Sequence, residues 1–231
     1  MKGRPSLQQF GQLIGVQFNN WQLLEQALTH SSYVNEMKEA GEDNERLEYL
    51  GDAVLELAMS TYLYEKYPEA EEGELSKLRA QYVCEEALVH YAQSIELYHY
   101  LRLGKGEEAS GGRERPAILA DAFEATLGAI YLDLGYQSAF DFLSRVVFTK
   151  IDNGFRIEFK DYKSQLQELV QADSNRSIHY KTVSEEGPAH NRIFTVEVYM
   201  DNILMGIGKG HSKKEAEQQA AKEALEKVAR G

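Results

Sequence analysis

A chain of 231 residues with 43% apolar residues is long enough for one large domain or two smaller ones, each with its own core. The single cysteine excludes an internal disulfide framework and a cysteine-based zinc site. The opening MKGRPSLQQF lacks the apolar run of a signal peptide, and charges interrupt every longer apolar segment, so we expect a cytoplasmic protein without a membrane partner.

The net charge of −12 argues against a nucleic-acid partner only if the charge is spread evenly. Of the 25 basic and 37 acidic residues, 12 of each lie from Arg156 onward, which leaves 13 basic and 25 acidic residues in 1–155. All of the excess acid therefore belongs to the first two thirds of the chain, and the last third is neutral.

Residues 1–150 have the patterns of helices and no long β alternation. Asn20 is a suitable N-cap for WQLLEQALTH, and the next apolar repeat, from Leu47 to Leu57, ends at Pro68. A second long helical pattern covers GELSKLRAQYVCEEALVHYAQSIELYHYL. The glycines and charges of GKGEEASGGRERP predict a loop over 104–116, and two further helices follow it.

The pattern changes after Phe155. DYKSQLQELVQ predicts a short helix, and SIHYKTVS, IFTVEVYM and ILMGIGKG have the alternation of strands, with a turn at Asp201 and Asn202. A final helix is predicted from Lys213 to about Ala229, with an alanine stripe that can lie close on a sheet. We therefore predict an all-α domain over 1–153 and a small α+β domain of α-β-β-β-α order over 158–231.

NERLEYLGDAVLELAMS contains four acids on one side of a predicted helix: Glu45, Glu48, Asp52 and Glu56. Taken alone, they are what the solvated face of any amphipathic surface helix looks like. A later helix alters that interpretation. Asp121 and Glu124 share one face of AILADAFEATLGAIYL, which is apolar nearly all round and is therefore expected to be buried.

Bare carboxylates on a buried helix cost several kcal/mol each unless a cation or a donor compensates them. If the two helices pack side by side, Glu48, Asp52, Asp121 and Glu124 gather around one point. Carboxylate oxygens suit Mg²⁺, with Mn²⁺ able to substitute, and a water retained by such an ion can attack a phosphodiester. The alternative is a structural salt bridge from Asp121 and Glu124 to an arginine or lysine.

NERLEYLGDAVL resembles the signature of the ribonuclease III family, and ALTHSSY, LGKGEEASGG and ILADAFEATLGAIYLD resemble further family segments in the same order. The α-β-β-β-α unit is similar to the double-stranded-RNA-binding domain that follows the nuclease domain in the bacterial enzymes. The resemblance covers residues from about 6 to 228. It implies the helical ribonuclease III fold and divalent-metal-dependent hydrolysis of both strands of duplex RNA.

The resemblance also implies roles for individual residues. The residues that would bind metal are Glu48, Asp52, Asp121 and Glu124. Asp52 and Glu124 are expected to matter most for turnover. Two further acids, Glu45 and Glu72, would support substrate handling. Glu56 has no counterpart and is expected to be surface charge. The family's nuclease domain is a homodimer, and Tyr49 stands where an aromatic residue inserts into the partner subunit. A core tyrosine is the other interpretation of Tyr49.

Affinity for RNA must come from outside the acidic part of the chain. Ser212 and Glu215 form a capping-box pattern that starts a helix at Lys213, where Lys213 and Lys214 match the family's phosphate-binding pair. Minor-groove contacts are implied for Gln167, Glu168 and His190, with Pro188 and Ala189 shaping the backbone of the loop that carries His190. Solvated lysines and an ordinary loop histidine are the plainer interpretations.

GIGKG and GKGEE lack the remaining features of nucleotide loops, so no nucleotide cofactor is expected.

The expected function is endonucleolytic cleavage of duplex RNA that leaves 5′-phosphate and 3′-hydroxyl ends with short 3′ overhangs. The resemblance implies maturation of ribosomal RNA precursors and processing of some messengers. A binding protein that keeps the fold without cutting is the rival from another class. A single-strand or DNA nuclease is a third candidate, disfavoured by a module whose contacts depend on 2′-hydroxyls.

Overall fold

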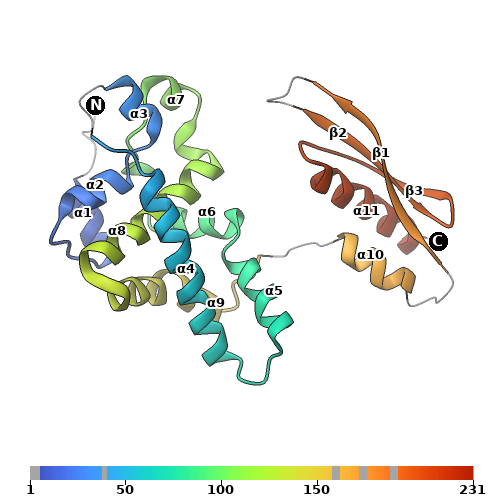
Figure 1. Ribbon diagram of the computed structural model, residues 1–231, viewed down its shortest axis with the longest axis horizontal. Helices are drawn as coiled ribbons and strands as arrows, with labels where there is room; N and C mark the ends of the chain where they lie inside the picture. The colour runs from blue at the N-terminus through green and yellow to red at the C-terminus, as the bar shows by residue number, and fades with distance from the viewer. Residues whose placement is uncertain (1–5, 38–40, 158–161, 172–175, 188–191, 231) are drawn as a thin grey trace. The chain divides into compact units, whose positions relative to one another are not determined.

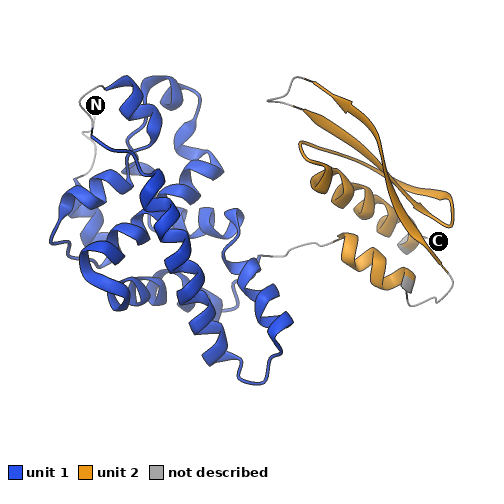
Figure 2. Ribbon diagram, viewed as in Figure 1, with its two compact units in different colours: residues 1–158 blue, residues 159–231 orange. Residues whose placement is uncertain are grey.

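The computed structural model describes residues 6–37, 41–157, 162–171, 176–187 and 192–230. The chain divides into two compact units, residues 1–158 and residues 159–231 (Figure 2). The described part of the first unit is helical, and the second has the order α-β-β-β-α. The predicted fold class is therefore confirmed.

Helices form the first unit (Figure 1). Its elements are α1 (Leu7–Ile14), α2 (Trp21–Ala27), α3 (Ser31–Glu36), α4 (Glu45–Lys66), α5 (Glu72–Tyr82), α6 (Glu85–Ser94), η1 (Leu97–His99), α7 (Lys105–Ala109), η2 (Gly112–Glu114), α8 (Pro116–Leu143), η3 (Ser144–Phe148) and α9 (Thr149–Asp152). Among the described residues, none of these helices combines the length and the apolar character that crossing a membrane requires.

The ends of these helices follow from local side chains. The predicted cap at Asn20 is confirmed, because its side chain accepts a hydrogen bond from the Gln22 N–H. α4 ends at Lys66, two residues before Pro68, as predicted. The long helical pattern predicted after it is instead broken at Cys84, a partly buried residue at the N-cap position of α6 rather than inside a helix.

The prediction of a plain loop over 104–116 was wrong. This segment contains α7 and η2, because distant side chains supply the partners that the local sequence lacks. The Glu36 carboxylate accepts from the N–H groups of Lys105 and Gly106 at 2.8 and 3.2 Å, and Ser32 Oγ accepts from the Gly104 N–H at 3.0 Å. These bonds hold the segment against α3.

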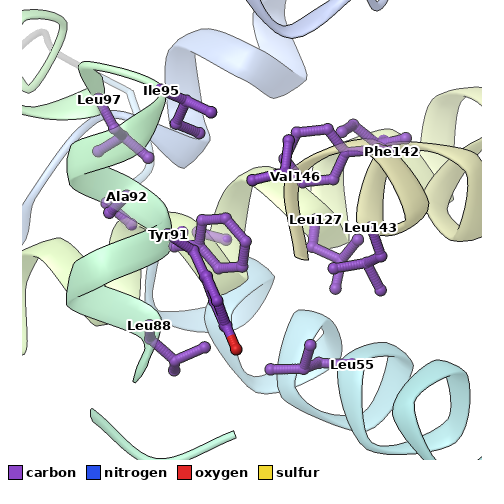
Figure 3. Packing of buried hydrophobic residues seen from close by; sticks show 14 of the residues in the cluster. Leu55, Leu88, Tyr91, Ala92, Ile95, Leu97, Leu127, Phe142, Leu143 and Val146 are labelled. Atoms are coloured by element: carbon purple, nitrogen blue, oxygen red, sulfur yellow. The ribbon is translucent and has the colours of Figure 1, made fainter. Parts of the chain in front are cut away.

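α4 and α8 lie side by side at the centre of the unit (Figure 1). Their backbones approach closely because Gly51 of α4 and Gly128 of α8 carry no side chain where the helices cross. A Cβ on Gly51 would overlap the Glu124 carbonyl oxygen, and one on Gly128 would overlap that of Leu47. Figure 3 shows the neighbouring core, in which Tyr91 of α6 extends toward Leu55 of α4.

The second unit packs two helices on one antiparallel sheet. Its elements are α10 (Tyr162–Gln171), β1 (Ile178–Glu186), β2 (Ile193–Met200), β3 (Ile203–Gly210) and α11 (Lys213–Arg230), with strand order β1-β2-β3. Asp201 and Asn202 both have positive φ, which is the two-residue hairpin turn predicted between β2 and β3. The alanine stripe of α11 packs on the sheet where β3 has glycines at 206, 208 and 210.

Candidate metal centre

Three predicted ligands meet between the two central helices. One carboxylate oxygen each from Glu48 of α4 and from Asp121 and Glu124 of α8 lie within 4.8 Å of one another. All three side chains are partly buried. The i,i+3 spacing puts both acids of α8 on the same side of that helix, and the glycine contact brings α4 close enough for Glu48 to join them.

Asp52, the fourth predicted ligand, lies outside this triad and is exposed. Its negative charge nevertheless contributes to raising the pKa of Glu124 and of Glu48, so it stands at the solvent side of the triad. Glu45, one turn before Glu48, is also exposed, and its charge acts on Glu48 and Asp121. The structure therefore brings carboxylate oxygens of three of the four acids within 4.8 Å of one another and leaves the fourth acid at the rim.

The triad holds carboxyl groups that resist ionisation. Burial, followed by the charges of Asp52 and Glu48, raises the pKa of Glu124 to about 8. Burial and the charge of Asp121 raise the pKa of Glu48. Burial also raises the pKa of Asp121, and His30 opposes that rise. The pKa values are raised by burial and by repulsion between negative charges. A divalent cation bound among these oxygens would offset both effects, because it would replace the lost solvation and balance the negative charges.

The donor set fits a hard divalent cation. It consists of carboxylate oxygens alone, without the thiolate or imidazole ligands that zinc prefers. The salt-bridge alternative requires an arginine or lysine paired with Asp121 and Glu124. Within the described part of the chain, no arginine or lysine forms an ion pair with Glu48, Asp121 or Glu124. The residues present are therefore suited to Mg²⁺ or Mn²⁺.

His30 is the residue that the sequence interpretation missed. Among the main neighbouring charges that shift the pKa values of the three carboxyl groups, His30 is the one basic side chain, and it acts on Asp121. Its Nδ1 accepts from the Ser32 N–H at 3.2 Å and lies 2.8 Å from Ser32 Oγ. The ALTHSSY segment was the available signal, but its histidine has no spacing relation to the acids.

Other predictions on α4 need correction. Leu57, expected on the apolar side with Leu47, is 57% exposed, and Tyr49 is 82% exposed, which rules out a core tyrosine within the single chain. Glu56, expected as surface charge, has a partly exposed carboxylate that pairs with Arg79 of α5 at 2.8 Å. Glu72 opens α5 and accepts from Ser76 Oγ at 2.8 Å, outside the triad.

The predicted RNA-contacting residues lie on the second unit. Gln167 and Glu168 are exposed on α10, and Lys213 and Lys214 are exposed in the first turn of α11. Ser212 Oγ accepts from the Glu215 N–H at 3.1 Å, while the Glu215 carboxylate accepts from the His211 N–H rather than from that of Ser212. Pro188, Ala189 and His190 fall outside the described residues.

Comparison with known proteins decides the family. A ribonuclease-III-like family model matches residues 20–151, and a double-stranded RNA binding motif matches residues 162–228. The chain belongs to the ribonuclease III family. A ribonuclease 3 of Bacillus cereus (strain G9842) is 54% identical over 98% of this chain and 93% of its own length, and one of Bacillus anthracis (strain CDC 684 / NRRL 3495) is 55% identical with the same coverage.

Solved structures agree with this placement. A ribonuclease III nuclease domain from Campylobacter jejuni, described in connection with a flexible region involved in dimer formation, is 39% identical with a TM-score of 0.58. The match covers 62% of this chain and 97% of that domain. A ribonuclease III-type endoribonuclease that carries an acidic triad and a double-stranded-RNA-binding module is therefore the class to which this protein belongs.

Proposed function

We propose that this protein hydrolyses both strands of double-stranded RNA with Mg²⁺ held by Glu48, Asp121 and Glu124 and by Asp52 at the rim of this triad. The observation that carries the proposal is the convergence of three partly buried carboxylates from α4 and α8, without a paired lysine or arginine among the described residues. Asp52 and Glu124 are assigned the largest share of turnover, with Asp52 on the solvent side that a substrate would approach.

The chemistry is phosphodiester hydrolysis. The oxygen of a water forms a bond to phosphorus, and the bond from phosphorus to the 3′ oxygen breaks, which leaves 5′-phosphate and 3′-hydroxyl ends. A bound Mg²⁺ supplies Lewis-acid activation and neutralises developing charge. The carboxylates hold the ion in place, and their raised pKa values mean that they release protons when they ionise to bind it. Glu45 and Glu72 are assigned to substrate handling, outside the triad.

The RNA-binding module provides the affinity that the acidic unit cannot. Lys213 and Lys214 at the start of α11 are assigned to backbone phosphates, where the free N–H groups of the helix end also favour anions. Gln167 and Glu168, with Pro188, Ala189 and His190, are assigned to minor-groove contacts that recognise A-form shape. The assigned roles in the cell are processing of ribosomal RNA precursors and of messengers in the cytoplasm.

Cleavage is tested with long duplex RNA, with Mg²⁺ and with EDTA. We expect short duplexes with 3′ overhangs in the Mg²⁺ reaction and intact RNA in EDTA. Fragment ends that accept a 3′ adapter without prior phosphatase treatment support the proposed bond cleavage, because they carry 3′-hydroxyls. Uncut RNA under both conditions supports the rival, a binding protein that does not cut, and would refute the proposal.

We further propose a homodimer formed through the exposed side of α4. Tyr49, Leu57 and Tyr64 are 82%, 57% and 73% exposed, and they lie along one stripe of this helix. Large exposed apolar side chains grouped in this way are typical of interfaces. A second copy is the occupant we favour, because a two-fold axis lets one stripe cover itself.

Such an axis also provides a place for Tyr49. Tyr49 lies eight positions before Leu57. If the two α4 helices cross antiparallel near Leu57, Tyr49 of one protomer meets the position eight residues after Leu57 in the other, next to the partner's Tyr64. Tyr64 lines a pocket of about 260 Å³ between α4 and α5, together with Leu63 and Leu75. A tyrosine ring entering this largely apolar pocket would be buried at the interface.

Leu57→Glu should convert the dimer into a monomer. Near a two-fold axis a residue meets its own copy, so the substitution places two carboxylates together in an apolar interface. Sedimentation velocity measures the outcome. Leu132→Glu is the matched control, because Leu132 of α8 is 52% exposed but lies off the α4 stripe. A Leu57→Glu protein that remains dimeric would contradict the proposed interface.

A further inference from the structure

Glu185, at the end of β1, links two cations of the RNA-binding module. Its carboxylate lies 3.0 Å from Lys213 Nζ and 3.5 Å from Arg192 Nη1. Lys213 Nζ also lies 5.6 Å from the centroid of the Phe194 ring, so the ammonium group is held between a carboxylate and an aromatic face. Lys213, assigned to RNA phosphate, is therefore ion-paired within the protein.

The sheet register explains this grouping. Glu185 lies opposite Phe194 of β2, and Phe194 lies opposite Gly210, the last residue of β3 before α11. Phe194 has the same alternation as the buried Val196 and Val198, which face the helices. Glu185 therefore points to the helix-covered face, toward the first turn of α11, at the end of the sheet where β1 and β2 are connected.

The charge of the whole module makes this contact important. Residues 159–231 contain 11 basic and 11 acidic residues, so the unit that binds a polyanion has a net charge of zero. Binding of a nucleic acid backbone ordinarily depends on an excess of positive charge. In a neutral module, the affinity depends on which cations are free to meet phosphate and which are already opposed by an acid.

We propose that Glu185 acts as an electrostatic brake on duplex RNA binding. Its carboxylate competes with phosphate for Lys213 and Arg192 and repels the backbone that approaches them. The inference rests on the proposed function, in which Lys213 contacts RNA phosphate. Both partners of the Lys213 pair are more than a third exposed, so the pair is weak enough for RNA to displace it. The consequence is a lower affinity and a faster release of duplex products.

The test measures binding of the full-length protein to a duplex of about 30 base pairs, longer than the roughly 16 that such a module spans. Fluorescence anisotropy in EDTA, at several KCl concentrations, avoids cleavage. Glu185→Gln should bind roughly two- to fivefold more tightly, the range expected for an exposed ion pair. Its plot of log affinity against log salt should steepen by up to about 0.9, because one more cation meets phosphate.

Glu186→Gln is the matched control. It removes the same charge from the next residue of β1, which points to the opposite face of the sheet. A net-charge effect would make both variants equally tight, whereas the brake predicts a larger gain for Glu185→Gln. Lys213→Ala should weaken binding and reduce the gain from Glu185→Gln when the two substitutions are combined, leaving the part of the gain that comes through Arg192.

Unchanged or weaker binding by Glu185→Gln, with an unaltered circular dichroism spectrum, would overturn the brake, since Glu185 would then orient Lys213 for RNA or have no effect. A gain equal to that of Glu186→Gln would also overturn it. If Lys213→Ala binds duplex RNA as well as the unsubstituted protein, the failure lies in the proposed role of Lys213 rather than in the charge of Glu185.

Discussion

Glu124→Gln should lower the rate of duplex RNA cleavage by roughly 10³-fold while leaving duplex binding intact. Glutamine keeps the size of the side chain and one oxygen, but it removes the negative charge with which Glu124 would bind a divalent cation. Glu124 is the most strongly perturbed acid of the three, and its oxygen lies within 4.8 Å of those of Glu48 and Asp121. Single-turnover cleavage with saturating protein separates this effect from binding.

Glu69→Gln is the control for that experiment, because it makes the same chemical change at an exposed glutamate outside the triad. It should cut at the normal rate. Normal cleavage by Glu124→Gln would contradict a role of this residue in the metal centre. Loss of duplex binding by Glu124→Gln would mean that Glu124 acts in RNA binding and not in cleavage.

The same substitution has a consequence for stability without metal. The pKa of Glu124 rises from an ordinary 4.5 to about 8 on folding, so between these values the folded state binds more protons than the unfolded state. The free energy of unfolding therefore falls as pH rises through this window. In EDTA at pH 8, Glu124→Gln should be more stable than the unsubstituted protein by on the order of 3 kcal/mol, and the gain should vanish near pH 4.5.

Gly51→Ala should destabilise the protein by about 3 kcal/mol or more and also remove metal binding. The added methyl group would overlap the Glu124 carbonyl oxygen, which is backbone and cannot rotate away. α4 and α8 must then separate, and Glu48 moves away from the two acids of α8. Urea denaturation measures the free energy of unfolding, and stabilisation by Mn²⁺ measures whether the site survives.

Gly73→Ala provides the comparison, since Gly73 also lies in a helix but a Cβ there would meet nothing within 4 Å. That substitution should leave metal binding unchanged and stabilise the protein slightly, by about 0.5 kcal/mol, because alanine favours helix. Equal stability of Gly51→Ala and the unsubstituted protein would mean that the close crossing of α4 and α8 does not build the site.

Spacing along single helices made part of the site predictable. The i,i+3 pair of Asp121 and Glu124 on an apolar helix, with Glu48 on a second helix, predicted the observed convergence. The position of Asp52 was not predictable in the same way, because it depends on how α4 is rotated against α8. That rotation is set by a backbone contact at Gly51, which hydrophobic periodicity does not encode.

The remaining differences have a related cause. The segment 104–116 is ordered by the Glu36 carboxylate, a partner about 70 residues away in the sequence, so its own glycines and charges indicated only a loop. Leu57 fits the apolar pattern of α4 but lies outside the core, because a helical repeat predicts which side of a helix is apolar and does not predict what covers that side.

Titration of Mn²⁺ into the metal-free protein, with free Mn²⁺ followed by electron paramagnetic resonance, tests the metal centre most directly. The unsubstituted protein should bind the ion saturably, and Glu48→Gln, Asp121→Asn and Glu124→Gln should each bind it at least about tenfold more weakly. Equal Mn²⁺ affinity in the unsubstituted protein and all three variants would contradict a site built by these carboxylates from α4 and α8.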